Sequence, residues 1–303
     1  MTLRVVPFFL FATACIQAPP PASHPYDSEL RVEDGAIHFR DIDAFSRIMS
    51  RLHDHGVSSL DEFEQQIGFS DSLRSARLEQ EHDPSLDAID IKDAFFATAV
   101  NRRGVFYIGD TVHKIGSEYE YAQEGGDEES LARLIADNEA SPRGNLIVHR
   151  ILGQDRRQAS LLPHFSGMES IIKGIGTDPG GAPKRVVMEA WSRNYLTYAS
   201  NGVNLTTESY RKTCGLCSKK WRDSAVPYLK VTVQSRQYSS ITGTGYWFVL
   251  NSEEEVYSYH HIQEVMDYVV GTGVWIDTDY IDCTYTYIPD DYIRRDDFVH
   301  WVN

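Results

Sequence analysis

The spacing of apolar residues changes along the chain, and the change predicts two regions of different structure. In the first, residues 30–173, apolar side chains recur every three or four positions, which is typical of helices packed on a core. Helices are expected around Phe45–Leu52, Leu60–Ile67, Ser72–Gln80, Asp83–Val100 and Leu131–Ile135. Two β-rich runs, 105–108 and 111–115, flank a Gly-Asp turn signal and predict a β-hairpin within this region.

From residue 185 onward the pattern is typical of β-strands. Aromatic and β-branched residues form short runs at 186–191, 195–198, 228–233, 245–250 and 284–288. Residues 253–270 interrupt them and are expected to be a helix or an acidic connection. The glycine-rich segment 174–184 is expected to be a linker between region 30–173 and the β-rich region 185–303. The predicted fold class is α+β: a helical N-terminal region with a β-hairpin, then a mainly antiparallel β-sandwich or partial barrel.

The first fifteen residues have the layout of an export signal. Arg4 precedes an apolar run over 5–11, and three small residues, 12–14, stand directly before Cys15. We expect residues 1–14 to be removed and Cys15 to become the lipid-bearing first residue of the mature chain. Ala12 stands where a lipobox prefers leucine, so ordinary cleavage and secretion is the alternative. Acyl chains contribute about 0.8 kcal/mol per buried methylene and hold a domain at a membrane without a spanning helix.

Composition and charge then narrow the class of partner. Residues 15–29 hold four prolines among small and polar residues, and they are expected to form a flexible tether. The net charge of −15 argues against a nucleic-acid partner, because phosphate recognition needs a basic face. The expected location is the outer membrane or cell surface, reached by lipid anchoring.

Three stretches of the first region resemble a known group of proteins. They are 34–45, 62–69 and above all Gly104–Ile115, and a weaker similarity lies at Trp191–Tyr195. Together they resemble bacterial, Bacteroidetes-like, cell-surface lipoproteins of unknown function. The resemblance implies lipidation and a surface location, and it implies no catalytic residue. The cysteine-bearing segment around 214–217 departs from that pattern.

The cysteines offer the most specific chemistry after the export signal. Cys214 and Cys217 are separated by two residues, a spacing used by structural disulfides, redox pairs and halves of zinc sites. Outside the cytosol a structural disulfide among Cys214, Cys217 and Cys283 is favoured. Free thiols, a redox pair, or a zinc site completed by Cys283 and a histidine of the pair at 260–261 remain open.

Other candidate sites are weaker. Asp277, Asp279 and Asp282 supply hard oxygen ligands for calcium, but their spacing matches no standard loop. His53 and His55 are expected in a solvated turn, because histidines two apart on a helix point apart. The glycines at 174 and 176 lack the sequence of a phosphate-binding loop. No cofactor is expected.

Two functions are compatible with these features of the sequence. The first is a non-enzymatic envelope protein whose β-rich region binds a glycan or another envelope component. The second is an envelope hydrolase or thiol enzyme with an unrecognised site. An exposed row of aromatic side chains on one sheet face favours binding, whereas a cleft with converging carboxylates or an exposed thiol beside a base favours catalysis. The sequence favours the binding module.

Overall fold

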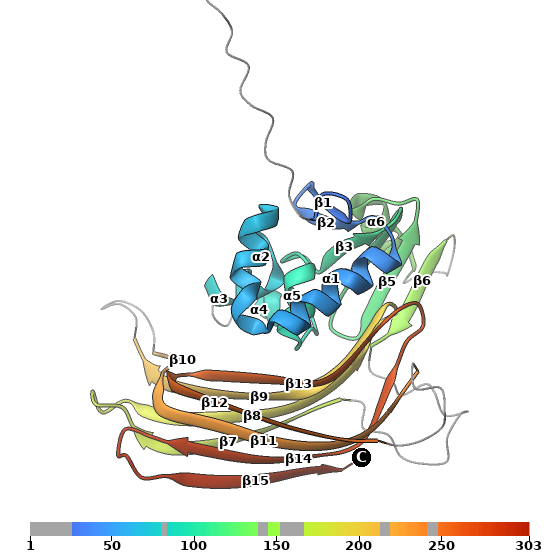
Figure 1. The fold of residues 1–303 in the computed structure, drawn as a ribbon. Coiled ribbons are helices and arrows are strands. Elements are labelled where there is room, and N and C mark those ends of the chain that lie inside the picture. Colours follow the sequence, from blue (N-terminus) through green and yellow to red (C-terminus); the bar gives the residue numbers. More distant parts are fainter. Residues whose placement is uncertain are drawn as a thin grey trace, which may run out of the picture.

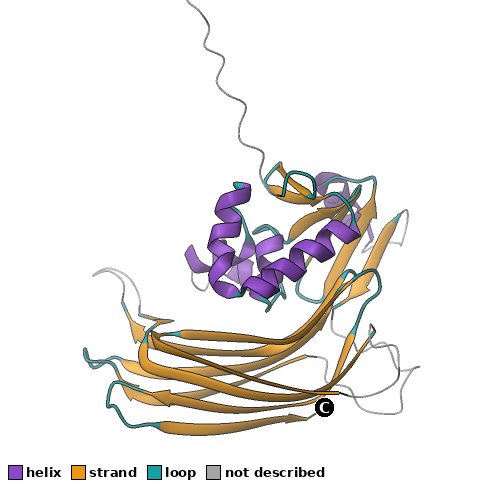
Figure 2. Ribbon diagram, viewed as in Figure 1, coloured by secondary structure: helices purple, strands orange, loops and turns teal. Residues whose placement is uncertain are grey.

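The fold is built from three β-sheets and a group of helices that gathers on one side of the molecule (Figure 1). The computed structural model describes residues 26–79, 84–138, 145–151, 167–212, 219–240 and 248–302. Neighbouring strands are antiparallel except for one parallel pair. Figure 2 shows the helices on one side and long strands below them. The predicted α+β class is confirmed, and the described sheets are open and arranged like a sandwich rather than closed into a barrel.

The helical elements lie in the first half of the chain. They are α1 (Ile42–His55), η1 (Val57–Ser59), α2 (Leu60–Ile67), α3 (Leu73–Glu79), α4 (Pro84–Asp87), α5 (Ala94–Ala99) and α6 (Glu128–Asn138). Asp41 caps α1, because its carboxylate accepts a hydrogen bond from the amide of Ala44 at 2.7 Å. Gly68, with φ of 66°, ends α2 in the left-handed conformation that glycine adopts without strain. The first three predicted helices are therefore confirmed.

The single helix predicted over 83–100 is wrong. Helix α4 ends at Asp87, and α5 starts afresh behind its own cap, Asp93, which accepts from the amide of Phe95 at 2.8 Å. The guanidinium of Arg77 binds the carbonyl oxygens between them, including that of Ile89 at 2.6 Å. These carbonyls are satisfied by a side chain from α3, so the segment needs no helical hydrogen bonds.

The first sheet, sheet A, carries the predicted hairpin. Its strands in spatial order are β1 (Leu30–Glu33), β2 (Ala36–Phe39), β3 (Val105–Ile108), β4 (Thr111–Ile115), β5 (Tyr119–Glu124) and β6 (Leu146–Arg150). Strands β3 and β4 are antiparallel around Gly109, as predicted. Leu131 of α6 packs on one face with Val105 and Val112, and Phe106 on the other face meets Phe45 of α1. The centre of sheet A, at β3 and β4, is thus covered on both sides.

The other two sheets form the sandwich. Sheet D contains β7 (Gly167–Thr177), β8 (Pro183–Asn194), β9 (Tyr198–Arg211), β10 (Lys220–Asp223) and β13 (His261–Val270). Sheet C has the order β12 (Phe248–Tyr259), β11 (Val226–Ser239), β14 (Ile276–Ile288) and β15 (Arg295–Val302). Inward side chains of both sheets, among them Val203, Leu229 and Ile281, share one apolar core.

Two expectations about this half of the chain are wrong. Residues 174–184 are no linker: they hold the end of β7, a turn and the start of β8. The carboxylate of Asp178 accepts from the amide of Ala182 at 2.8 Å and closes that turn. Residues 253–270 are neither helix nor loop but the greater part of β12 and β13. Of their acidic residues, Glu253 and Glu255 occupy exposed positions of the alternating strand β12, whereas Glu254, Glu264 and Asp267 are half-buried.

The helical region packs directly on sheet D. Tyr195 and Tyr198, at the turn into β9, lie in the same core as Phe45 and Phe96, and Tyr268 of β13 packs against it. Gln263 of β13 accepts from the amide of Ala94 at 2.7 Å. Regions 30–173 and 185–303 therefore meet through a shared apolar core, in which the helices cover β13 and the start of β9 while Ile171 and Ile172 of β7 stay exposed.

Candidate functional site

The outer face of sheet C, here called the sheet C face, is the candidate binding surface. Side chains alternate along its strands, so every second one points away from the sandwich core. On β11 the inward residues are buried and the outward ones are partly or fully exposed. The outward set is Tyr228, Lys230, Thr232, Gln234, Arg236 and Tyr238 on β11, Val249, Asn251, Glu253, Glu255 and Tyr257 on β12, Tyr280, Asp282 and Thr284 on β14, and Asp296, Phe298 and His300 on β15.

Large apolar groups on this face are exposed to solvent. Tyr257 is 68% exposed and Phe298 65%, values that set them apart from the buried tyrosines of the core. Tyr257 lies beside Tyr228 on the next strand, with ring centroids 5.2 Å apart. At the far end of β11, Tyr238 packs against Trp275 at 5.0 Å. The face thus carries an aromatic pair at each end, and Phe298 lies between them along the strand direction.

Charged groups on the sheet C face are largely bound to one another. Lys230 contacts Glu253 at 2.6 Å. The phenol of Tyr228 donates to Glu255 at 2.9 Å, and burial together with this bond raises the pKa of Tyr228 to about 12. His300 contacts Asp282. At neutral pH the tyrosine therefore stays a protonated hydrogen-bond donor.

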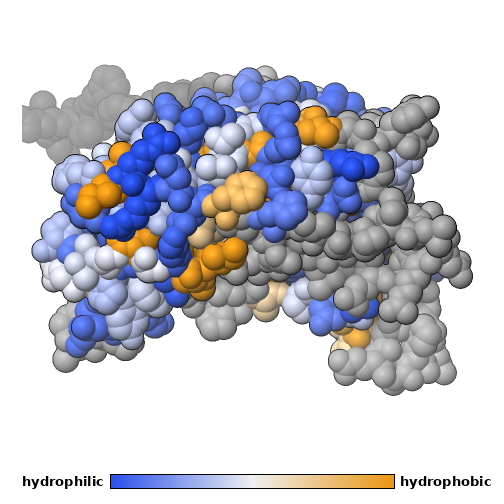
Figure 3. Space-filling model, turned by 90° about the horizontal axis from the view of Figure 1, so that it is seen from below, coloured by the Kyte–Doolittle hydropathy of each residue, from blue (hydrophilic) through white to orange (hydrophobic). Residues whose placement is uncertain are grey.

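Neutral polar groups occupy the middle of the face. The amide of Gln234 donates to Asn251 at 2.9 Å, and both side chains are exposed. Thr232 and Thr284 lie opposite each other on neighbouring strands. Figure 3 views the molecule from the side where β14 and β15 lie in Figure 1, and the described surface there is mainly hydrophilic with isolated hydrophobic side chains. The surface is polar, with aromatic groups set into it.

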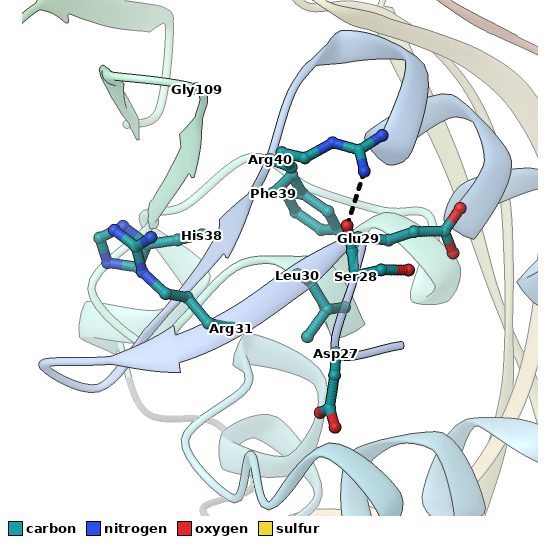
Figure 4. A pocket seen from close by; sticks show the side chains of 9 residues that line it. All are labelled: Asp27, Ser28, Glu29, Leu30, Arg31, His38, Phe39, Arg40 and Gly109. Carbon is teal, nitrogen blue, oxygen red and sulfur yellow. Dashed lines mark hydrogen bonds between the residues drawn. The ribbon is translucent and has the colours of Figure 1, made fainter. Parts of the chain in front are cut away.

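A small pocket lies at the other end of the molecule, beside the β1–β2 hairpin (Figure 4). Its volume is about 210 Å³, and its lining is Asp27, Ser28, Glu29, Leu30, Arg31, His38, Phe39, Arg40 and Gly109. Arg40 donates to the carbonyl of Ser28 at 2.8 Å. Glu29 is held by Arg47 at 2.6 Å and by Arg51 at 2.7 Å. Much of the charge in this pocket is thus engaged within the protein.

A buried polar cluster joins the helices to sheet D. His53 lies 2.9 Å from the phenol oxygen of Tyr198, which donates to Asp93. The imidazole stacks on Tyr268 with centroids 3.7 Å apart, and burial lowers the pKa of His53. The predicted solvated turn is therefore wrong for His53: α1 directs it into the junction, where a neutral imidazole is favoured.

The cysteine candidates are only partly within the described residues. Cys283 lies on β14 inside the sandwich as a free, buried thiol. Burial raises the pKa of Cys283 to about 12, which keeps the group protonated at neutral pH. Cys15, Cys214 and Cys217 lie outside the described residues, so their predicted lipidation and disulfide roles stay predictions.

The three candidate calcium ligands are spread along β14. Asp279 sits at a bulge and contacts Arg236 at 3.3 Å, while Asp282 contacts His300 on the neighbouring strand. In the part of the chain that the structure describes, no three His, Cys, Asp or Glu side chains come together to hold a metal ion. His261 lies 3.0 Å from Thr206, and His260 is directed toward Asp223 instead.

The main residues of the sheet C face were not singled out from the sequence. In the sequence these residues are the polar members of an alternating apolar–polar pattern over 228–238 and 249–257. The pattern can be recognised only when both segments are known to be long strands. Gly174 and Gly176 lie at a bulge where β7 pairs with β8, a structural role for the glycines there.

No protein-family model matches this sequence, and comparison with curated proteins gives no match either. Among the described helices, none has the length and apolar character needed to cross a membrane.

Proposed function

We propose that this protein is an exported bacterial envelope protein, anchored by an acyl group on Cys15, that binds another envelope component through the sheet C face. The proposal for export and anchoring is supported by the layout of residues 1–15 and by the resemblance to surface lipoproteins. The observation that carries the binding role is the open sheet C face with its exposed Tyr257 and Phe298.

Exposed aromatic groups on an open polar sheet face are better suited to binding than to catalysis. Tyrosine buries a large apolar area at low conformational cost and offers a hydroxyl, which makes it frequent in binding surfaces. Leaving such rings in water forgoes the stabilisation that burial gives, about 25 cal/mol per Å² of apolar area. On sheet D, by contrast, Tyr198 and Tyr268 are packed beneath the helices, and Tyr210 stays exposed near the end of β9.

The thiol chemistry of the alternative function finds no support in Cys283. A catalytic thiol acts as the thiolate, which requires a lowered pKa and access to substrate. Cys283 is buried and its pKa is raised to about 12. The binding role is therefore the one we adopt.

Export and anchoring are tested by mass spectrometry of the mature protein from its native cells. We expect an N-terminal Cys15 carrying acyl chains, and a Cys15→Ser variant released from the membrane fraction. An intact Met1 would overturn this part of the proposal.

Binding is tested by sedimentation of the purified chain, residues 26–303, with envelope material from the same cells. We expect the wild type to sediment with the envelope and the double variant Tyr228→Ala/Tyr257→Ala to remain in solution. Tyr210→Ala, which removes an exposed ring from sheet D, is the matched control and should sediment normally. Equal sedimentation of wild type and double variant would contradict the proposal.

A further inference from the structure

The two aromatic pairs of the sheet C face define the length of its ligand. Tyr228 and Tyr238 are ten residues apart on the same strand, β11, which corresponds to roughly 33 Å along the sheet. Tyr257 packs against Tyr228 at one end, and Trp275 packs against Tyr238 at the other. Each end of the face therefore presents two rings. A ligand that contacts both pairs must be an extended chain lying along β11.

The charge of the face defines the chemistry of that chain. Lys230 and Arg236 stand among a larger number of carboxylates on the same face, which include those of Glu253, Glu255, Asp279, Asp282 and Asp296. The excess of negative charge repels an anionic polymer. Lys230 and Arg236 are also already engaged, with Glu253 and Asp279, so a charged ligand would have to displace an existing partner. The face therefore suits a neutral ligand.

The middle of the face supplies the groups that a neutral polar chain needs. Gln234 and Asn251 present amides that both donate and accept, and Thr232 and Thr284 present hydroxyl groups. Such side chains hydrogen-bond to hydroxyl groups, while aromatic rings pack on apolar ring faces. A polysaccharide combines both kinds of surface in every unit, whereas an extended peptide would seek the backbone groups of a sheet edge rather than the centre of a face.

Resting on the proposed binding role of the same face, we propose that the ligand is a neutral polysaccharide that lies extended along β11. Its terminal contacts are the aromatic pairs Tyr228–Tyr257 and Tyr238–Trp275, and its central contacts are Gln234 and Asn251. Because no ionic contact contributes, binding is insensitive to salt.

The experiment is affinity electrophoresis of the purified chain, residues 26–303, in gels containing a neutral β-glucan, a mannan or a dextran, with alginate as the anionic comparison. We expect retardation by at least one neutral polymer, unchanged by about 1 M salt, where the Debye length is about 3 Å. Gln234→Ala and Tyr228→Ala/Tyr257→Ala should each raise the Kd about tenfold, equivalent to about 1.4 kcal/mol. Tyr210→Ala should bind like the wild type.

Three outcomes would overturn this inference: retardation by alginate alone, loss of retardation in salt, or no retardation by any of the neutral polymers. If the chain nevertheless sediments with envelope material and the Tyr228→Ala/Tyr257→Ala variant does not, the binding role of the face survives and only the polysaccharide is excluded. Thermal unfolding of each variant distinguishes lost contacts from lost folding.

Discussion

The two outer faces of the sandwich carry similar residues and have different neighbours. On sheet D, Gln263 donates to the carbonyl of Lys92 at 2.7 Å and to Asn204 at 2.8 Å, so its amide is used within the protein. On sheet C, Gln234 and Asn251 bond to each other and remain exposed. The same kind of side chain, a glutamine amide, therefore fixes the helices on one face and is available to a ligand on the other.

The two faces are best separated by truncating one aromatic side chain in the helical cover of sheet D and one on the sheet C face. In the cover, Phe96 of α5 is fully buried among Phe106, Tyr195 and Tyr198. Phe96→Ala is expected to lower the free energy of unfolding by about 3–5 kcal/mol, measured by urea denaturation, because it leaves a cavity. Phe298→Ala on the sheet C face is expected to change it by less than about 0.5 kcal/mol. Similar losses for both variants would mean that the sheet C face is covered.

A smaller loss of stability is expected from adding a methyl group at Gly202, a position in sheet D with no room for a side chain. A methyl group on Gly202 would lie 2.3 Å from the carbonyl oxygen of Glu264 and 2.7 Å from the ring of Trp191. Gly202→Ala should therefore lower the free energy of unfolding by about 1–3 kcal/mol, since strand and ring must both shift. Gly174→Ala, at the end of β7, meets open space and serves as the control in the same denaturation series. A Gly202→Ala protein of wild-type stability would contradict the close approach of β9 and β13.

The junction beneath the helices should also respond to acid. Burial lowers the pKa of His53, so the unfolded chain takes up the proton at a higher pH than the folded chain does. Stability contributed by this group is therefore complete above about pH 6.5 and falls as the pH drops below it. Asp93, 4.0 Å from the imidazole, partly opposes the shift, while Tyr198, Tyr268 and Phe95 exclude water.

Thermal unfolding between pH 7.5 and pH 5 measures this dependence. A His53→Gln variant should be less stable at pH 7.5 and should lose less on acidification than the wild type. The same pH dependence in both proteins would remove His53 as its source.

The stability contributed by Glu254, on the edge strand β12, should depend on pH in the opposite direction. Burial, with Glu264 beside it on β13, raises the pKa of Glu254 to about 7. The folded chain holds this proton more tightly, so the contribution is present below the unfolded value and is lost as the pH rises through 7. Glu254→Gln should be more stable than the wild type at pH 8 and no more stable near pH 4. Glu255→Gln, exposed on the same strand, is the control.

The smallest effect on stability is expected from Tyr257→Ala. The side chain is mostly exposed, so its removal should leave the free energy of unfolding within about 0.5 kcal/mol of the wild type. The same substitution is expected to weaken envelope binding. A large loss of stability would show that the ring is structural and would weaken the case for the sheet C face.

Local sequence signals predicted the elements whose structure is decided locally. The end of α2 before Gly68 and the hairpin at Gly109 depend on neighbouring residues, and both were predicted. Distant contacts decided what was missed. The break between α4 and α5 depends on Arg77, and the burial of His53 depends on tyrosines more than a hundred residues away. Beyond the predicted run 245–250, which overlaps the start of β12, the rest of β12 and all of β13 were missed because their acidic residues obscured the alternation.

The candidate surface was predictable only in kind. An aromatic-rich sheet was expected to bind, yet which tyrosines are exposed depends on which sheet the helices cover, and nothing near Tyr198 or Tyr257 in the sequence decides that. The predicted roles of Cys15, Cys214 and Cys217 depend on export, and these cysteines lie outside the described residues.

Photo-crosslinking in the native envelope is the most direct test of binding through the sheet C face. A diazirine amino acid is placed at Thr232 in the middle of the sheet C face, or at Ile172, which is 56% exposed on β7 of sheet D. If the sheet C face binds the envelope, illumination joins an envelope component to the chain labelled at position 232 and leaves the chain labelled at position 172 unmodified. Adducts from position 172 with none from 232 would contradict binding through this face.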